Sequence, residues 1–156
     1  MKTRAFVAGL LMAAGLSTLT LSAPAPAVGQ TTEIGRIKSV VGTAALWQGG
    51  QGPAKPAAPG AQLKVSDVLT TGPNGRIGLT FIDNSRFAIG PNSRVALSQF
   101  EFDDTTHRGR SLTTVERGSL GVVSGQIAKE NKDAMKVRTP TSLLAARGTT
   151  FAVDVP

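Results

Sequence analysis

The side chains that could do chemistry and lie closest together in this sequence are Glu101, Asp103, Asp104 and His107. Paired carboxylates can act as acid and base on a glycosidic bond, clustered carboxylates can bind calcium, and a histidine can activate a serine. His107 is the only histidine, and we expect it to be solvated in a polar turn. Adjacent carboxylates in a turn diverge, and no third one recurs at calcium-loop spacing. These residues therefore indicate neither catalysis nor metal binding, and a hydrolase using the three carboxylates is only an alternative.

Other residue types exclude further classes of chemistry. The chain has no cysteine, so disulfide scaffolds, thiolate metal sites and cysteine nucleophiles are all excluded. It has no phosphate-binding P-loop and no G-x-G-x-x-G motif that opens a helix. Six phenylalanines, one tryptophan and no tyrosine leave little for a stacking platform or an aromatic sugar cleft. The sequence therefore predicts a protein that is not an enzyme and uses no cofactor.

The elements that would position a site are organised around residues 67–97, which read as an antiparallel β-meander. Turn signals occur at 73–75, 83–85 and 90–93, where Asn and Gly tolerate positive φ and Asp, Asn and Ser bond their own backbone. Between these turns the apolar residues alternate with a period of two, so they share one face of the strands. The residues on that face are Ile77, Leu79, Phe81, Phe87, Ile89, Val95 and Leu97.

The alternation slips after this meander, because Phe100 and Phe102 lie at even positions whereas Val95 and Leu97 lie at odd ones. A bulge near Ser98–Gln99 would return both rings to the core face. The alternative is that the two rings face a second sheet.

Further strand-like pieces follow along the chain. Two of them, 112–115 and 120–123, are broken at Arg117–Gly118, and the charged stretch 126–134 reads as a hairpin tip. Residues 143–146 fit either a helical turn or a strand. Strand-like pieces thus recur about every ten residues with turns between them, which is typical of a β-sandwich.

The segment before the meander is extended and then irregular. Residues 34–47 read as one or two strands, with a bulge or bend at Gly42. Three prolines and four glycines in residues 48–62 predict a long loop.

Residues 1–27 are predicted to be a secretory signal peptide. Lys2 and Arg4 give the N-terminus a positive charge, and an apolar stretch follows. Small residues then lead up to Ala27, and we expect cleavage after this residue. A retained membrane anchor is the alternative, although the apolar run is short for a span. No later segment reaches the length of a membrane span. The predicted location is the periplasm or the extracellular space.

The formal net charge of +7 would fall by two, to +5, with the loss of Lys2 and Arg4. In an exported protein this charge favours an acidic cell-wall component, lipid headgroups or an acidic protein surface over nucleic acid. The basic residues are scattered along the chain, so a solubilising surface also explains them.

An ordered set of short motifs resembles the FecR domain. In chain order the set comprises Leu63, Asp67-Val-Leu-Thr-Thr-Gly72, the Asn74-Gly75 turn, residues 79–81, the Asp83-Asn84-Ser85 and Pro91-Asn92-Ser93 turns, Arg117-Gly118, Thr139-Pro-Thr141, and a closing Arg147-Gly-Thr-Thr-Phe151 followed by Val153. The match covers residues 34–155. Ser66 and Asn84 stand where the family usually has glycine, and Asn84 tolerates the positive φ of such a turn.

The resemblance implies an all-β domain with a jelly-roll-like, two-sheet sandwich, and a short β-solenoid is the structural alternative. It also implies a non-enzymatic module for sensing or protein–protein contact in the cell envelope, with a link to signalling and an envelope protein as partner. Binding of an envelope polysaccharide or peptidoglycan is the functional alternative. Arg147 and Thr149 are expected to tie the last strand to the meander. We expect the informative residues to set turns rather than to form a site: Asn74, Gly75, Asp83, Asn84, Ser85, Asn92, Ser93 and Gly148.

Overall fold

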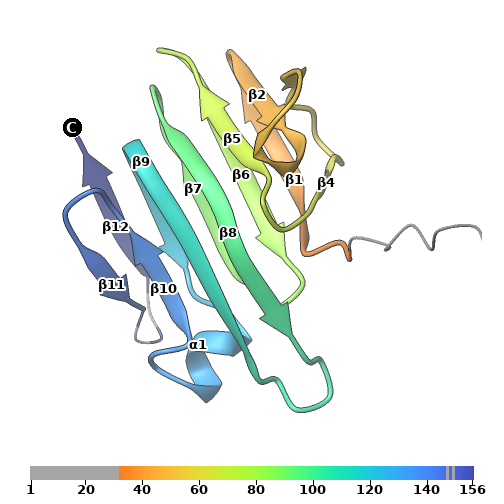
Figure 1. Cartoon of the computed structure of the whole chain (residues 1–156), viewed down its shortest axis with the longest axis vertical. Coiled ribbons are helices and arrows are strands. Elements are labelled where there is room, and N and C mark those ends of the chain that lie inside the picture. Colours follow the sequence, from red (N-terminus) through yellow and green to blue (C-terminus); the bar gives the residue numbers. More distant parts are fainter. Residues whose placement is uncertain (1–31, 147, 149) are drawn as a thin grey trace, which may run out of the picture.

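The computed structural model describes residues 32–146, 148 and 150–156, so the predicted signal peptide, Arg147 and Thr149 lie outside the described residues. The described chain is mostly strand, and the all-β prediction is confirmed (Figure 1). The elements are β1 (Gly35–Val41), β2 (Ala44–Trp47), the 3-10 turn η1 (Gln48–Gly50), β3 (Lys55–Pro56), β4 (Gln62–Leu63), β5 (Val68–Thr71), β6 (Arg76–Phe81), β7 (Arg86–Ile89), β8 (Arg94–Phe102), β9 (Gly109–Val123), α1 (Gln126–Glu130), β10 (Met135–Arg138), β11 (Leu143–Ala145) and β12 (Thr150–Val155).

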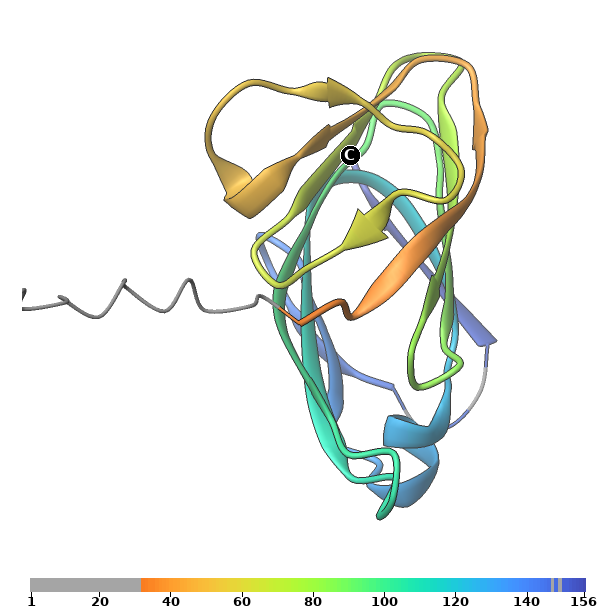
Figure 2. The same ribbon diagram turned by 90° about the vertical axis from the view of Figure 1, so that its right-hand side faces the viewer.

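The strands form one continuous, curled sheet whose order is β3-β2-β5-β8-β9-β7-β6-β1-β4. The long strand β9 joins its two halves, because its first part pairs with β8 and β10 and its second part with β7 and β12. Seen from the side, the two halves face each other as layers (Figure 2). The finer description as a jelly-roll-like sandwich, or alternatively a β-solenoid, stays a prediction.

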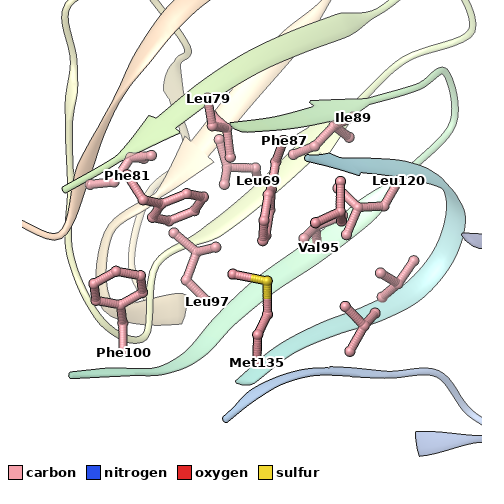
Figure 3. Packing of buried hydrophobic residues seen from close by; sticks show 14 of the residues in the cluster. Leu69, Leu79, Phe81, Phe87, Ile89, Val95, Leu97, Phe100, Leu120 and Met135 are labelled. Atoms are coloured by element: carbon pink, nitrogen blue, oxygen red, sulfur yellow. The ribbon is translucent and has the colours of Figure 1, made fainter. Parts of the chain in front are cut away.

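The core fills the space between the two halves of the sheet. The alternating residues predicted to share one face are buried, with Ile77, Leu79 and Ile89 at most 2% exposed. In Figure 3, Phe81 and Phe87 reach from one half toward Phe100 and Leu97 of the other. The rings of Phe81 and Phe87 meet edge to face at 4.7 Å, and those of Phe81 and Phe100 stack at 5.4 Å. The Phe81–Phe100 stack therefore joins the two halves across the core, and the Phe81–Phe87 contact packs neighbouring strands of one half.

The predicted irregularities in two strands are confirmed. The register of β8 against β9 shifts between Leu97 and Gln99, which keeps Phe100 on the buried face. Gly42, with φ of 66°, bends the chain between β1 and β2. This bend lets one extended segment enter both halves of the sheet, since β1 pairs with β6 and β2 with β5.

Two predictions about the second half of the chain are wrong. Residues 112–115 and 120–123 belong to one strand, β9, because Gly118 takes a φ of 84° and bends the strand without ending it. The stretch 126–134 is not a simple hairpin tip, since it begins with helix α1, which buries Ile127 and Ala128 under one end of the core. Two apolar residues in so short a helix give no readable period.

The assignment left open at residues 143–146 is now settled, because residues 143–145 form a strand, β11, rather than a helical turn. The predicted long loop at 48–62 contains only short pieces of regular structure, η1, β3 and the start of β4. Within the described part of the chain, no helix is long and apolar enough to cross a membrane.

Candidate functional site

A turn cluster, made of Thr71, Gly90, Ser93, Gly118 and Ser119, closes one end of the fold. Thr71 Oγ1 donates to Gly90 O at 2.6 Å and accepts a hydrogen bond from Ser93 N at 2.9 Å. Ser93 Oγ accepts a hydrogen bond from Ser119 N at 3.0 Å. Thr71 is 7% exposed and Ser93 is fully buried, so these bonds replace water. They connect β5, the turn between β7 and β8, and β9.

Gly118 permits the close contact inside the turn cluster. A Cβ at this position would lie 2.1 Å from Ser93 Oγ and 2.5 Å from Ser93 Cα, and its φ of 84° is itself unfavourable for other residues. Gly148 also has a positive φ, 68°, but among the other described residues no atom would lie within 4 Å of an added Cβ. A substitution at Gly118 would therefore meet both a steric overlap and an unfavourable φ, whereas one at Gly148 would meet the unfavourable φ alone.

Three predicted turn residues lie beside the turn cluster. Asn74 and Gly75 lie in the turn between β5 and β6, where Gly75 N donates to Gly72 O at 2.9 Å. Asn92, with φ of 51°, lies in the turn between β7 and β8, and its N–H donates to the same oxygen at 3.0 Å. The two turns are thus joined through one carbonyl.

The remaining predicted turn, Asp83-Asn84-Ser85, lies at the opposite end of β6. Asp83 Oδ1 accepts hydrogen bonds from Ser85 N at 3.0 Å and Ser85 Oγ at 2.6 Å, and Asn84 has a φ of 64°. Asp83 is fully buried, and its Oδ2 has no hydrogen-bond partner among the described residues. Gln126 N donates to Asp83 O at 2.8 Å, so this turn also anchors the start of α1.

Asp67, in the motif set, is buried and links two neighbouring segments through its carboxylate. Its Oδ1 accepts a hydrogen bond from Gly49 N at 2.8 Å, and its Oδ2 accepts one from Lys64 N at 2.9 Å. The preceding Ser66 has a φ of 73°, which explains why glycine suits this position in the family pattern. Asp67 therefore holds the long loop against the sheet.

The acidic residues near the β8–β9 hairpin are exposed and already have local partners. Asp103 Oδ1 accepts hydrogen bonds from Thr105 N at 2.9 Å and Thr106 N at 3.3 Å. These backbone bonds, that of Thr105 first, hold the pKa of Asp103 below its ordinary value. Glu101 forms an exposed ion pair with Arg110 at 3.2 Å.

His107 and Asp104 complete this hairpin. The imidazole of His107 stacks on the ring of Phe102, with ring centres 6.4 Å apart. No group of three or more potential metal ligands gathers among the described residues. The hairpin therefore gives no arrangement that would carry hydrolysis, and a hydrolase is not proposed.

A basic groove of about 520 Å³ lies on the outer surface where β8, β9, β10 and β11 are neighbours. Lys136 and Arg138 are exposed on β10, alternating with the buried Met135 and Val137. β10 runs parallel to β9, which places Lys136 beside Leu112. The side chains that characterise this basic groove are Gln99, Arg110, Leu112, Asn131, Asp133, Lys136, Arg138 and Leu143.

The outer surface of the other half of the sheet has a different character. The strand registers align Gly78, Ala88, Gly121 and Ala152 in one row across β6, β7, β9 and β12. This surface therefore presents backbone and small side chains along its middle.

These features define an all-β module whose motif residues hold the backbone rather than present reactive groups. The FecR protein family model matches residues 67–155, more than half of the 156-residue chain. The chain therefore belongs to the FecR family, which is a non-enzymatic regulatory and sensing family. No curated protein and no solved structure gave a match.

The sequence did not indicate the basic groove. Arg110 and Lys136 are far apart in the chain and come together through a parallel pairing that local patterns do not reveal. The only available signal was the alternation of Lys136 and Arg138 with apolar neighbours, which places both cations on one strand face.

Proposed function

We propose that the protein is a non-enzymatic, exported FecR module for sensing or protein–protein contact in the cell envelope, with a role in signalling. The observation that supports this most directly is that the family's motif residues have a structural role. Thr71, Ser93 and Asp83 are buried and make hydrogen bonds within turns, so they stabilise a scaffold and leave recognition to its surface. FecR proteins are periplasmic in part and are linked to protein interactions in envelope signalling.

The proposed domain spans residues 34–155, beyond the part that the family model matches. β1 pairs with β6 and β2 pairs with β5, so residues before 67 complete both halves of the sheet. A protein lacking residues 34–66 would leave one edge of β5 and of β6 unpaired and would lose Ile37, Leu46 and Leu63 from the core. We therefore expect it to be insoluble or unfolded, whereas the protein beginning at Val28 stays folded.

Export is tested by producing the full chain with a C-terminal tag and separating cell fractions. Cleavage after Ala27 predicts a periplasmic or secreted product whose N-terminal residue is Val28. A matched chain without residues 1–27 should stay in the cytoplasm. Recovery of an uncleaved chain in the membrane fraction would support the anchor instead.

Partner contact is tested by photo-crosslinking in intact cells, with the crosslinker placed singly at exposed positions of both outer surfaces, such as Arg76 and Ser98. A sensing or contact module predicts one discrete adduct from a cluster of neighbouring positions. The same positions in a Gly118→Val background, where the fold should be lost, provide the control. Absence of a discrete adduct from every position would count against the proposal.

A second candidate is binding of an acidic envelope polysaccharide. The specific observation in its favour is the basic groove, where Lys136 and Arg138 are both exposed. It predicts sedimentation with purified cell wall that weakens as salt is added.

A further inference from the structure

We infer that the basic groove is a binding site for a carboxylate-bearing saccharide. This inference rests on the proposed location in the cell envelope and gives the second candidate function a site and a ligand class. The groove lies beside β9 and β10, which run next to each other in Figure 1. Its volume of about 520 Å³ falls within the usual range of small-molecule sites.

The positive charge of the groove is available to a ligand. Among the described residues, ion pairs engage Arg36, Arg94 and Arg110. Lys136 and Arg138 have no such partner in the described part of the chain. They lie two residues apart on one strand face, so their Cα atoms are about 6.6 Å apart along β10. Two unpaired cations at this spacing suit an extended ligand with repeated negative charges.

The groove also offers partners for hydroxyl groups. Asn131 Oδ1 accepts a hydrogen bond from Asp133 N at 3.0 Å, which leaves its NH2 group to donate. Gln99 Nε2 donates to Glu101 Oε1 at 3.3 Å, which leaves its carbonyl oxygen to accept. The carboxylate of Asp133 can accept hydrogen bonds from hydroxyls but repels other anions.

This combination favours an acidic saccharide over an acidic peptide. A peptide site gains most of its affinity from apolar side chains seated in pockets, yet the groove lining is largely polar and includes Leu112 and Leu143 as its large apolar side chains. Asp133 would repel a run of glutamates, whereas it can bind the hydroxyls that lie between the carboxylates of a uronic acid polymer. The half-buried Leu112 gives the floor a small apolar surface for sugar C–H groups.

Binding of tetragalacturonate to the purified mature chain, measured by calorimetry at low and high salt, tests this inference. We expect the paired change Lys136→Gln and Arg138→Gln to weaken binding about tenfold, since each exposed charge contact contributes modestly. The paired change Lys38→Gln and Arg76→Gln removes the same charge from the opposite outer surface. It should change the affinity less than about twofold. Thermal unfolding of both variants checks that the fold is intact.

Asp133→Asn separates the saccharide from a simple polyanion. It should weaken tetragalacturonate binding about threefold, because one of the two oxygens that accept from hydroxyls becomes an NH2 group, and it should strengthen binding of poly-glutamate, because the negative charge that repels it is removed. Equal losses from the two paired variants, tighter binding of poly-glutamate than of the saccharide by the unmodified chain, or no saccharide binding at low salt would each overturn the inference. The photo-crosslinking experiment is independent of this result, so a protein partner would survive failure of the saccharide site.

Discussion

The turn cluster and the basic groove differ in burial, in hydrogen bonding and in the way the sequence encodes them. In the turn cluster, Thr71 and Ser93 are buried, and the hydrogen bonds of their side chains connect three separate segments of the chain. In the groove, Lys136 and Arg138 are exposed, and among the described residues neither has an ion-pair partner. The turn cluster contains Thr71, Ser93 and Gly118 of the family motif set, whereas none of the residues that line the groove belongs to that set.

This difference shows why a family signature is a poor guide to the ligand of a binding module. A motif that fixes turns reports what the scaffold needs to fold, and many surfaces can be built on one scaffold. Changes in the turn cluster should therefore lower stability, whereas changes in the groove should alter binding and leave stability unchanged.

The largest loss of stability is expected from Gly118→Val. The new Cβ would overlap Ser93, and valine strongly disfavours a φ of 84°. We expect a loss of more than about 4 kcal/mol in the free energy of unfolding, or failure to fold. Denaturant titration measures it.

Gly148→Val is the matched control, because its φ of 68° is similar but the space around its Cβ is open. Its cost should be about 1–2 kcal/mol, from backbone conformation alone. Equal losses from the two variants would show that the contact with Ser93 is not what makes Gly118 necessary.

The next largest effect is expected from Thr71→Val. The substitution keeps the shape of the side chain but leaves Ser93 N without its acceptor and Gly90 O without its donor. Leaving the buried Ser93 N and the half-buried Gly90 O unpaired should cost about 3 kcal/mol. Thr114→Val provides the control, since the Thr114 hydroxyl bonds Ser98 on an exposed face, where water can replace it. A similar loss in the free energy of unfolding from both variants would show that the buried hydrogen bonds of Thr71 stabilise the fold no more than the exposed hydrogen bond of Thr114 does.

Much of the fold was predictable from local sequence patterns, whereas the contacts that form the turn cluster and the basic groove were not. The period-two face of Ile77 and Leu79, the bulge after Leu97 and the bend at Gly42 all follow from sequence spacing. The bond between Thr71 and Ser93 does not, because it depends on how distant turns meet.

The same limit explains what sequence reasoning missed. Helix α1 is stabilised by burial of Ile127 under the core rather than by a repeating pattern. The basic groove arises from the parallel pairing of β9 and β10, which brings residues from two distant segments to one surface. Tertiary contacts, not local preferences, create both features.

A smaller loss is expected from Asp83→Ala. The substitution removes the acceptor of Ser85 N and Ser85 Oγ inside the protein, which should cost about 2 kcal/mol. Removal of the buried Oδ2, which has no partner in the described part of the chain, offsets part of the loss. Asp103→Ala, in a similar but exposed turn, should leave the unfolding midpoint unchanged. A comparable shift in both variants would show that burial does not decide the importance of such turns.

A small gain in stability is expected from Ser66→Gly. Serine at a φ of 73° is strained, and glycine relieves the strain but increases the entropy of the unfolded chain. The net gain should be about 0.5 kcal/mol, seen as a higher midpoint in thermal unfolding. Asn84→Gly is the matched change at the other departure from the family pattern, and it should have less effect because asparagine tolerates positive φ. A loss of stability in Ser66→Gly would mean that the serine contributes more than its backbone strain costs.

The smallest effect is a local one, at the exposed Asp103 turn. Hydrogen bonds from Thr105 N and Thr106 N lower the pKa of Asp103 in the folded chain. Their contribution is therefore fully present above the unfolded pKa and is lost as pH falls through the lower, folded value. Amide shifts of Thr105 and Thr106, followed by NMR from about pH 6 to pH 2, should show one inflection below the ordinary aspartate range near pH 3.9.

Asp103→Asn should remove that inflection, and Asp104→Asn should keep it. An inflection at or above the ordinary value would contradict the hydrogen bonds from the two amides. The global unfolding midpoint should hardly respond, because water can replace these bonds at an exposed turn. Asp103 thus accepts hydrogen bonds from backbone groups, as the turn cluster does, but is exposed, as the groove residues are. A small effect of its substitution on stability would show that burial, rather than hydrogen bonding alone, decides which turn residues stabilise the fold.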